Sequence, residues 1–226
     1  MNLTRCEKII GIDAITKLKN TKILLVGLGG VGGICFEMLI RSGIENITVT
    51  DYDIFEESNL NRQILSLNNN IGKKKVDIAK AFANSINENC VINSFYNKVN
   101  EEFLSNFNKD FDYIIDACDD VNAKVQLVKF ALKNDIKIIS SCGTGNRLDP
   151  TKLHYTNIWK TENDPLAKKF RNALRKERIT YKLPVVTSNE VPLLKSNDFV
   201  GSMAFVPNSS GIMLASYVIN DVINIK

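Results

Sequence analysis

A glycine-rich segment, Gly27-Leu-Gly-Gly-Val-Gly-Gly33, directly follows a short apolar run that is typical of a buried strand. Gly27 permits a tight turn, Gly29 lets a phosphate approach the backbone, and Gly32 allows the next helix to pack closely on the strand. The start of that helix offers free backbone N–H groups to an anion. The segment therefore predicts a nucleotide-binding loop, whose predicted ligand-binding glycines are Gly27, Gly29, Gly30 and Gly32.

Polar residues after the second predicted strand suggest which nucleotide is bound. Asp51 has the spacing of a carboxylate that accepts hydrogen bonds from ribose hydroxyls, which suits both NAD and ATP. The segment from Asp51 to Gln63 then combines carboxylates, amides and one arginine, for which hydride transfer has little use. Arg62 could clamp a triphosphate through its planar fork of donors, and Lys75 could add a second positive charge. A solvated loop and a surface lysine are the alternative interpretations.

Carboxylates also follow the fourth predicted strand, in the segment Asp116-Ala-Cys-Asp-Asp120. Carboxylate oxygens at this edge of a sheet suit Mg²⁺ that is bound to phosphate oxygens. An N-cap of the following helix is the alternative role of Asp119 or Asp120.

Alternating strand and helix patterns must bring these residues to one edge of a sheet. Strands are predicted at residues 21–26, 47–50, 91–96, 113–116 and 137–140, with helices near 32–42, 73–86, 101–107 and 121–134. This alternation predicts an α/β fold with a Rossmann-like, doubly wound, mostly parallel sheet. After residue 140 we expect a C-terminal extension of short strands and helices, with a charged helix near 164–178, a polar stretch to 199 and a last helix near 210–223.

Composition narrows the class of protein. Of 226 residues, 44% are hydrophobic and 24% are charged, which is typical of a globular domain. Five scattered cysteines without a Cys-x-x-Cys pair indicate reduced thiols rather than a zinc site. Apolar stretches are too short to span a bilayer, and no signal segment opens the chain, so we expect a soluble, cytoplasmic protein with no membrane partner.

A basic run favours a polyanionic partner. Seven basic residues lie between Lys168 and Lys182, against the single acid Glu177, a density that suits contacts with nucleic-acid phosphates. A solvated helix face is the alternative. Trp159 and Tyr155 are predicted on a strand as core or surface side chains, and His154, the only histidine, is predicted to be structural. The candidate RNA-binding residues are Lys168, Lys169, Arg171, Arg175, Lys176 and Arg178.

Several of these motifs occur in an order that resembles the ThiF/MoeB (HesA) superfamily, whose adenylating enzymes are akin to ubiquitin activators. The shared motifs are Gly-x-Gly-Gly-x-Gly, Asp51, Ser58-Asn-Leu-Asn-Arg-Gln63, Gly72 to Lys75 and Asp116-x-x-Asp119. The resemblance covers roughly residues 5–145 and implies an ATP site in which Asp51 holds the ribose and Asp119 the magnesium. It assigns Asn59, Arg62, Gln63 and Lys75 to the same site, and Arg5 to the phosphates of a neighbouring subunit, which implies a homodimer.

The second half resembles the tRNA threonylcarbamoyladenosine dehydratase family. The motifs are Gly143-x-Gly145, Asp149-Pro-Thr151, Thr161-x-x-Asp-Pro-Leu166 and Arg171-x-x-Leu-Arg-Lys176. The resemblance implies ATP-dependent cyclisation of the modified adenosine in tRNA through an acyl-adenylate, and suggests a monovalent cation near Gly143–Asp149. It divides the single domain, residues 1–226, into a nucleotide-binding half (1–140) and a substrate-binding and dimer half (141–226).

Three other functions stay open at this point. The first is adenylation of the C-terminus of a small sulfur-carrier or ubiquitin-like protein, although the chain has no cysteine after Cys142 to relay sulfur. The second is an NAD(P)-dependent oxidoreductase, and the third is a nucleotide-binding sensor without catalysis. For the adenylating enzyme, the predicted catalytic residues are Arg62, Lys75, Asp119 and Arg5.

Overall fold

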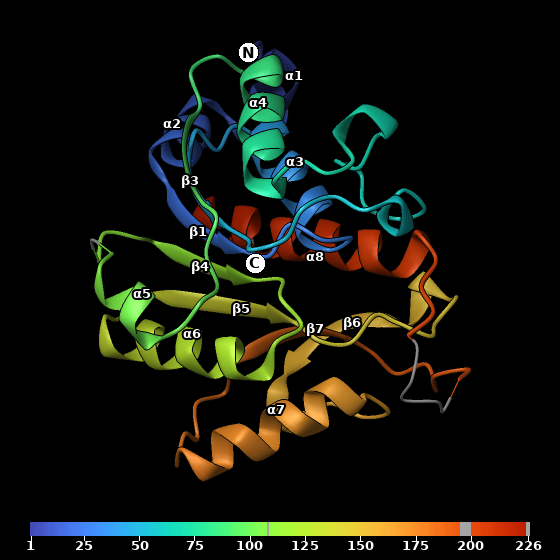
Figure 1. Cartoon of the computed structure of the whole chain (residues 1–226). Helices are drawn as coiled ribbons and strands as arrows, with labels where there is room; N and C mark the ends of the chain where they lie inside the picture. Colours follow the sequence, from blue (N-terminus) through green and yellow to red (C-terminus); the bar gives the residue numbers. More distant parts are fainter. Residues whose placement is uncertain (108, 195–199, 225–226) are drawn as a thin grey trace.

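Strands and helices alternate through the first part of the chain (Figure 1). The structure is a computed structural model that describes residues 1–107, 109–194 and 200–224. Two helices, α1 (Thr4–Ile10) and α2 (Ile12–Asn20), precede the first strand and were not predicted. The next elements are β1 (Lys22–Val26), α3 (Gly32–Arg41), β2 (Asn46–Thr50), α4 (Lys75–Ile86), β3 (Val91–Phe95), α5 (Glu101–Ser105), β4 (Tyr113–Asp116), α6 (Val121–Lys133) and β5 (Lys137–Ser141).

All strands form a single sheet with the order β3-β2-β1-β4-β5-β7-β6. The later elements are β6 (Leu153–Asn157), the 3-10 helix η4 (Ile158–Lys160), α7 (Pro165–Lys176), β7 (Pro184–Ser188) and α8 (Phe205–Val222). Neighbouring strands run parallel except at the edge, where β6 is antiparallel to β7. The α/β, mostly parallel fold with a C-terminal extension is confirmed.

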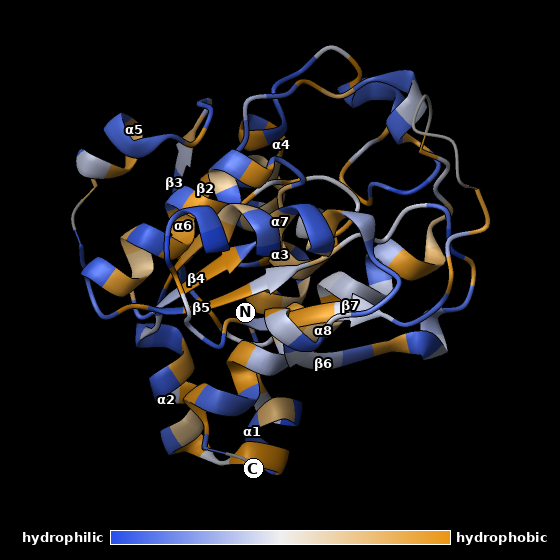
Figure 2. Ribbon diagram, turned by 90° about the horizontal axis from the view of Figure 1, so that it is seen from below, coloured by the Kyte–Doolittle hydropathy of each residue, from blue (hydrophilic) through white to orange (hydrophobic). Residues whose placement is uncertain are grey.

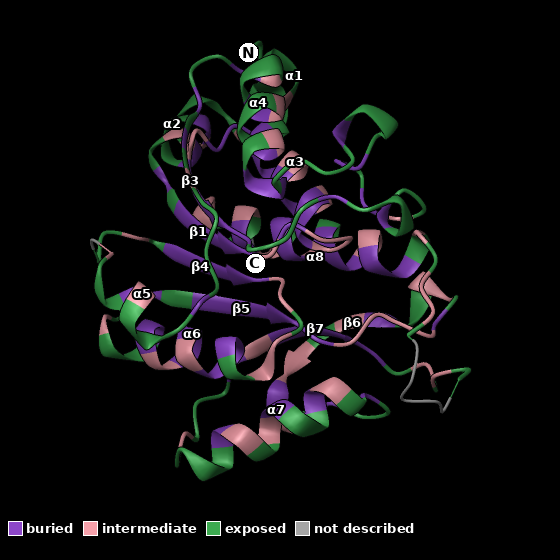
Figure 3. Cartoon of the chain, in the orientation of Figure 1, coloured by how far each residue is buried: buried purple, intermediate pink, exposed green. Residues whose placement is uncertain are grey.

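Helices cover both faces of the sheet, and the side chains of β1 pack against the helices on both sides. Ile23 and Leu25 belong to the core on the side of α3 and α8, whereas Leu24 and Val26 belong to the core on the side of α6 and α7. Successive side chains of a strand point to opposite faces, so a strand between two helix layers is apolar throughout. Figure 3 shows β4 and β5 buried, and Figure 2 shows α7 as largely hydrophilic on its outer side.

The strand order reverses between β1 and β4, which is the position where open α/β sheets bind ligands. In the register of the sheet, Val26 at the end of β1 is opposite Thr50 of β2 and Asp116 of β4. The loops after these three strands therefore begin side by side, and they carry the predicted nucleotide-binding residues.

Two predictions in the C-terminal half are wrong. The strand β7 lies in the stretch that we expected to be polar, and Val185 and Val186 are fully buried between β5 and β6. Only two apolar residues in succession mark this strand, so the local pattern was too short to detect. Trp159 lies in η4 and not on a strand, although Tyr155 does lie on β6. The division of the chain at residue 140 stays a prediction.

The helix α8 begins at Phe205, earlier than predicted, and packs along α3. Gly211 of α8 lies so close to α3 that an added Cβ would be 2.1 Å from the Val31 carbonyl oxygen. In the described residues no helix is both long enough and apolar enough to cross a membrane.

Candidate functional site

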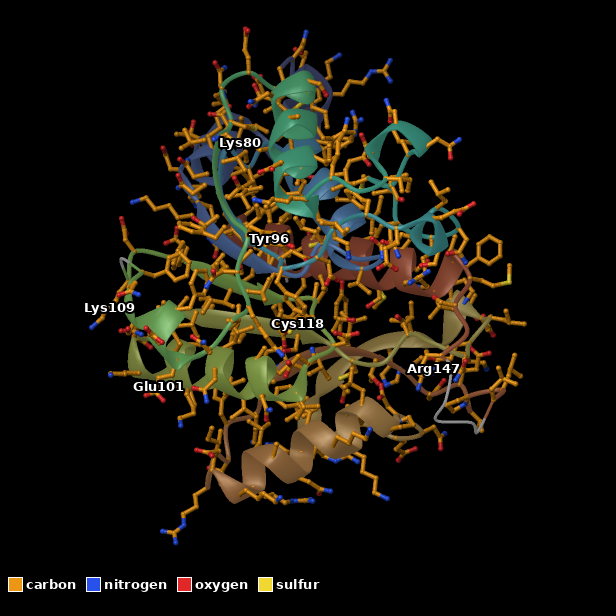
Figure 4. The ribbon with its side chains drawn as sticks, in the orientation of Figure 1. Lys80, Tyr96, Glu101, Lys109, Cys118 and Arg147 are labelled. Carbon is orange, nitrogen blue, oxygen red and sulfur yellow. The ribbon has the colours of Figure 1, made fainter. Side chains whose placement is uncertain are left out.

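A large cavity of about 1420 Å³ opens at the carboxyl ends of the central strands. The loops after β1, β2 and β4 line one part of it, and the segments 143–147 and 163–171 line another. Tyr96, Cys118 and Arg147 all line this cavity and come from the loops after β3, β4 and β5 (Figure 4). One cavity therefore combines the predicted nucleotide loop with residues of the C-terminal half.

The glycine loop connects β1 to α3 as predicted. Gly27, Gly29 and Gly30 line the cavity, whereas Gly32 is buried behind it. An added Cβ on Gly32 would lie 1.8 Å from the carbonyl oxygen of Gly27, so only glycine lets the helix start this close to the strand. The N-cap position of α3, Val31, makes no side-chain hydrogen bond, which leaves the helix N-terminus suited to an anion.

The Asp51 carboxylate is buried at the end of β2 and fixes the loops on both sides. Its Oδ2 accepts a hydrogen bond from the Leu28 backbone N–H at 2.6 Å, and its Oδ1 accepts one from the Asp53 N–H at 2.8 Å. Burial raises the pKa of Asp51, and Lys75 and the two backbone N–H groups oppose that shift. Each carboxylate oxygen has a second lone pair, so the group can still accept hydrogen bonds from ribose hydroxyls.

Arg62, Asn59 and Gln63 extend from one turn into the cavity. The Arg62 guanidinium donates to the Ser58 carbonyl and the Asn61 side chain, both at 2.8 Å. The Asn59 side chain is buried and accepts from the Glu56 N–H, which holds the turn in place. Among the described residues, the buried Gln63 Oε1 has no hydrogen-bond partner, so this acceptor is available to a donor in the cavity.

Lys75 is the first residue of α4 and is only 4% exposed. Its Nζ lies 2.9 Å from Asp53 Oδ2, and Asp53 also lines the cavity. Asp53 is a residue that our sequence reasoning missed, because only the fold brings it to Lys75. The pair holds an ammonium group at the cavity wall, where a phosphate could share it.

The carboxylates after β4 have three different surroundings. Asp116 is fully buried and pairs with Lys124 Nζ at 3.0 Å, while Asp120 is the N-cap of α6 and pairs with Lys98 at 3.0 Å. The N-cap alternative therefore holds for Asp120. Asp119 lines the cavity and is exposed, so its carboxylate is open to a cation.

The described residues contain no cluster of three or more acidic, histidine or cysteine ligands. One carboxylate is nevertheless compatible with Mg²⁺, because this ion commonly binds one or two carboxylates together with substrate phosphates and water. Asp119 fits that role, and its assignment to magnesium stays a prediction.

The buried Asp116–Lys124 pair holds the loop that carries Asp119 through hydrogen bonds to the backbone. Asp116 Oδ1 accepts from the Cys118 N–H at 3.2 Å, and Lys124 Nζ also donates to the Ser141 carbonyl at 2.8 Å. Burial alone would lower the pKa of Lys124, but the Asp116 carboxylate raises it, so the ammonium group stays charged. Lys124 carried no signal in the sequence that distinguished it from a surface lysine.

Asp164 joins the C-terminal half of the cavity to α7. Its Oδ1 accepts from the Ala167 N–H at 2.8 Å and caps the helix, while its Oδ2 accepts from the Gly143 N–H at 2.9 Å. Arg147 lies 3.8 Å from the same carboxylate and donates to the carbonyls of Gly143 and Asn163. The aspartate of Thr161-x-x-Asp-Pro-Leu166 thus positions the Gly143–Arg147 loop. The monovalent cation near this loop stays a prediction.

The predicted RNA-binding residues divide between two places. Lys168, Lys169 and Arg171 line the large cavity, whereas Arg175 and Arg178 line a second hollow of about 400 Å³. Arg171 also donates to the Thr161 carbonyl at 3.0 Å, so it has a structural contact besides any ligand. Lys176 is exposed and lines neither.

Two cysteines line the large cavity, and both are protonated thiols. Burial, followed by the Asp116 carboxylate, raises the pKa of Cys118 well above its usual value, and burial likewise raises the pKa of Cys142. Because the thiolate is the nucleophilic form, neither side chain is suited to accept an acyl group.

Arg5 lies on α1, away from the cavity of its own chain. It is exposed and is not among the cavity residues. No residue of α1 is buried, and Ile9 is 83% exposed. Its predicted role at a neighbouring subunit's phosphates stays a prediction.

Comparisons with known proteins show the family of this chain. Residues 3–221 match the model of the ThiF family. A Bacillus subtilis (strain 168) protein named tRNA threonylcarbamoyladenosine dehydratase is 36% identical over 240 residues, which cover 97% of this chain and 94% of the relative. A Saccharomyces cerevisiae protein named tRNA threonylcarbamoyladenosine dehydratase 2 is 39% identical over 81% of this chain but only 42% of its own length.

A solved structure is similar over nearly the whole chain. The crystal structure of E. coli tRNA N6-threonylcarbamoyladenosine dehydratase in complex with AMP superposes with a TM-score of 0.92. The two sequences are 28% identical, and the match covers 98% of this chain and 93% of the E. coli chain. A further structure of the E. coli protein contains ATP.

Proposed function

The chain belongs to the ThiF family, and on that premise we propose that it is an ATP-dependent tRNA threonylcarbamoyladenosine dehydratase. Its substrate is the N6-threonylcarbamoyladenosine of a tRNA, and its product is the cyclised form of that nucleoside, which has lost one molecule of water. The reaction proceeds through an acyl-adenylate.

One observation carries this proposal. The same cavity holds the glycine loop with Arg62, Lys75 and Asp119 at one part and the basic residues Lys168 and Lys169 at another. The first set suits a triphosphate, and the second suits the phosphates of an RNA that delivers its modified base to the nucleotide. An enzyme that used NAD would need the glycine loop but not Arg62, Lys75 and Asp119.

In the first step a carboxylate oxygen of the threonyl group attacks the α-phosphorus of ATP. A new oxygen–phosphorus bond forms, and the bond to the leaving pyrophosphate breaks. Arg62 and Lys75 stabilise the negative charge that develops on the phosphate oxygens. Magnesium would supply further charge neutralisation at the phosphates, with Asp119 as its protein ligand.

In the second step a nitrogen or oxygen of the carbamoyl group attacks the activated carbonyl of the same side chain. The five-membered ring closes as AMP leaves, and an N–H proton of the carbamoyl group passes to water. Because both reacting groups belong to one side chain, proximity replaces an enzyme nucleophile. The protonated thiols of Cys118 and Cys142 are consistent with a route that has no thioester.

The assembly that we propose is a homodimer, in which Arg5 of one subunit contacts phosphates in the other. The exposed α1, with no buried residue of its own, supports a contact with a second copy. The tRNA would contact Lys168, Lys169, Arg171, Arg175, Lys176 and Arg178. We expect this enzyme in the cytoplasm, together with its tRNA.

The decisive experiment supplies purified protein with ATP, Mg²⁺ and tRNA that carries N6-threonylcarbamoyladenosine. We expect mass spectrometry of the digested nucleosides to show the loss of one water, with AMP and pyrophosphate formed in equal amounts. A parallel reaction offers a small sulfur-carrier protein in place of tRNA. Pyrophosphate release with the carrier alone would replace this proposal by the carrier-activation alternative.

A further inference from the structure

A second hollow lies beside the C-terminal end of α7, outside the ATP cavity. Trp159, Arg175, Arg178, Ile179 and Thr180 line it, and we call it the Trp159 hollow; its volume is about 400 Å³. The Arg175 guanidinium carbon lies 5.6 Å from the centre of the indole ring. An aromatic face and a guanidinium plane thus meet at the surface of the protein.

The local backbone fixes the indole in this position. Trp159 Nε1 donates to the Tyr181 carbonyl at 2.8 Å, and the Asn157 side chain accepts from the Trp159 N–H at 3.0 Å. Arg178, just beyond the C-terminal end of α7, has a φ of 57°, so the chain turns back there and brings Tyr181 to the indole. The N–H group of the ring is therefore satisfied, while part of the ring remains accessible.

The charge around the hollow selects an anion. Arg175, Lys176 and Arg178 are all exposed, and the acid between them, Glu177, is paired with Lys129 at 3.1 Å. Within the described part of the chain, the Arg178 guanidinium has no hydrogen-bond or ion-pair partner. A ligand with both a flat π face and a phosphate uses every feature of this hollow, because nucleobases stack on aromatic rings and on arginine planes.

The position along α7 relates this hollow to the ATP cavity. Lys168 lines the cavity, and Arg175, which lines the hollow, lies seven residues further along α7, which corresponds to about 10 Å of helix. A stacked strand advances about 3.4 Å per nucleotide, so this distance equals about three nucleotides. A neighbour of the nucleotide in the cavity can therefore reach the hollow.

We propose that the Trp159 hollow binds an unpaired nucleotide of the RNA substrate. The base stacks on the indole and the Arg175 plane, and Arg178 binds the phosphate. This inference rests on the proposed function and adds to it a site that requires single-stranded RNA. A duplex presents phosphates but no free base face, and it would gain nothing from the indole.

The test uses the fact that Trp159 is the only tryptophan of the chain. An unmodified stem-loop RNA with an unpaired loop is titrated into the protein, alongside a fully paired two-stranded RNA duplex with the same number of nucleotides. We expect the stem-loop to quench the tryptophan emission in a saturable manner and the duplex to leave it unchanged. Binding of both RNAs is measured separately by the anisotropy of a fluorescein attached to the RNA.

Variants refine the experiment. Trp159→Ala should weaken binding of the stem-loop by about 10-fold or more, since a stacked base contributes that much, and Trp159→Phe should restore most of it. Arg178→Ala should weaken binding of the stem-loop, whereas Lys80→Ala removes the same charge from exposed α4 and should change it less than twofold. If Trp159→Ala does not fold, the emission of the wild-type protein still decides.

The outcomes separate this inference from the proposed function. Suppose that the wild-type protein converts tRNA, but that the stem-loop does not change its tryptophan emission and binds Trp159→Ala as tightly as wild type. The hollow is then not an RNA site, and the proposed function stands. If the protein neither binds nor converts tRNA, both proposals are overturned. Equal quenching by the duplex would also exclude the unpaired base as the ligand.

Discussion

At the scale of single residues, Lys75 is buried, whereas Lys73, two residues earlier, is exposed. Arg62→Ala and Lys75→Ala should each lower turnover by about 100-fold or more at saturating ATP, because one preorganised charge at a developing oxyanion contributes about 3 kcal/mol. Lys73→Ala is the matched control, since this side chain is exposed and lies outside the cavity. The measurement is pyrophosphate release. Wild-type rates for both variants would place the phosphates elsewhere.

The buried thiol of Cys35 should make the free energy of unfolding fall at alkaline pH. Burial raises the pKa of Cys35 above its usual value of 9.0, so the folded protein retains a proton that the unfolded chain loses. The contribution to stability is fully present below about pH 9 and is lost as the pH rises, with a slope of about 1.4 kcal/mol per pH unit.

Urea unfolding between pH 8 and pH 11 tests this dependence. Cys35→Ala should reduce the slope of the unfolding free energy against pH, whereas Ile40→Val, a core change on the same helix, should lower the whole curve without changing its slope. Parallel curves for wild type and Cys35→Ala would contradict the prediction.

At the scale of elements, the contact of α8 with α3 depends on Gly211. Alanine normally stabilises a helix interior relative to glycine by about 0.5–1 kcal/mol. At Gly211 the sign should reverse, because the added Cβ would meet the Val31 carbonyl, and overpacking costs about 1–3 kcal/mol. Gly33→Ala on α3 is the control, since its Cβ would meet neighbours at no less than 3.5 Å. The measurement is thermal unfolding. A melting temperature of Gly211→Ala at or above that of Gly33→Ala would refute a tight contact between α8 and α3.

The ion pair of Asp116 and Lys124 connects β4, α6 and β5. Lys124→Met should destabilise the protein by about 3–5 kcal/mol, because it leaves a buried carboxylate without a partner. The exposed pair of Lys137 and Asp221 offers a comparison, and Lys137→Ala should cost less than about 1 kcal/mol. Denaturant titration measures both. Equal effects would mean that water reaches Asp116 in the folded protein.

The sequence predicted those parts of the site whose signals are local. The glycine loop, Asp51 and Lys75 were predictable because turn chemistry and strand ends depend on neighbouring residues. Asp53 was not, because its contact with Lys75 follows from how the chain folds back. Asn208 was missed for the same reason: from α8 it donates to the Arg62 carbonyl at 3.0 Å, across most of the sequence. The strand β7 has only two adjacent buried valines and becomes recognisable only between its neighbours.

At the scale of the whole molecule, the proposed dimer makes a prediction about mixtures. If Arg5 acts in the neighbouring subunit, an Arg5→Ala chain paired with an Arg62→Ala chain has one intact site and one doubly defective site. Equal mixing and exchange of the two inactive variants should then restore about one quarter of the wild-type activity.

The control for this experiment is each variant incubated alone, which should stay inactive. If Arg5 acts within its own chain, every site of the mixed dimer is defective and no activity returns. Activity that returns in a mixture whose subunits do not exchange would also exclude the shared site, because no mixed dimer has formed.

The packing of α8 on α3 has a consequence for synthesis on the ribosome. The two helices share one core, with Phe36 and Leu39 on α3 and Leu214 and Val218 on α8. At about 5–20 residues per second, α3 emerges about nine to thirty-five seconds before α8. The nascent chain therefore carries an uncovered apolar helix, next to the loop for the nucleotide, until late in translation. Slow codons between the two helices should lengthen that interval and increase the dependence of folding on chaperones.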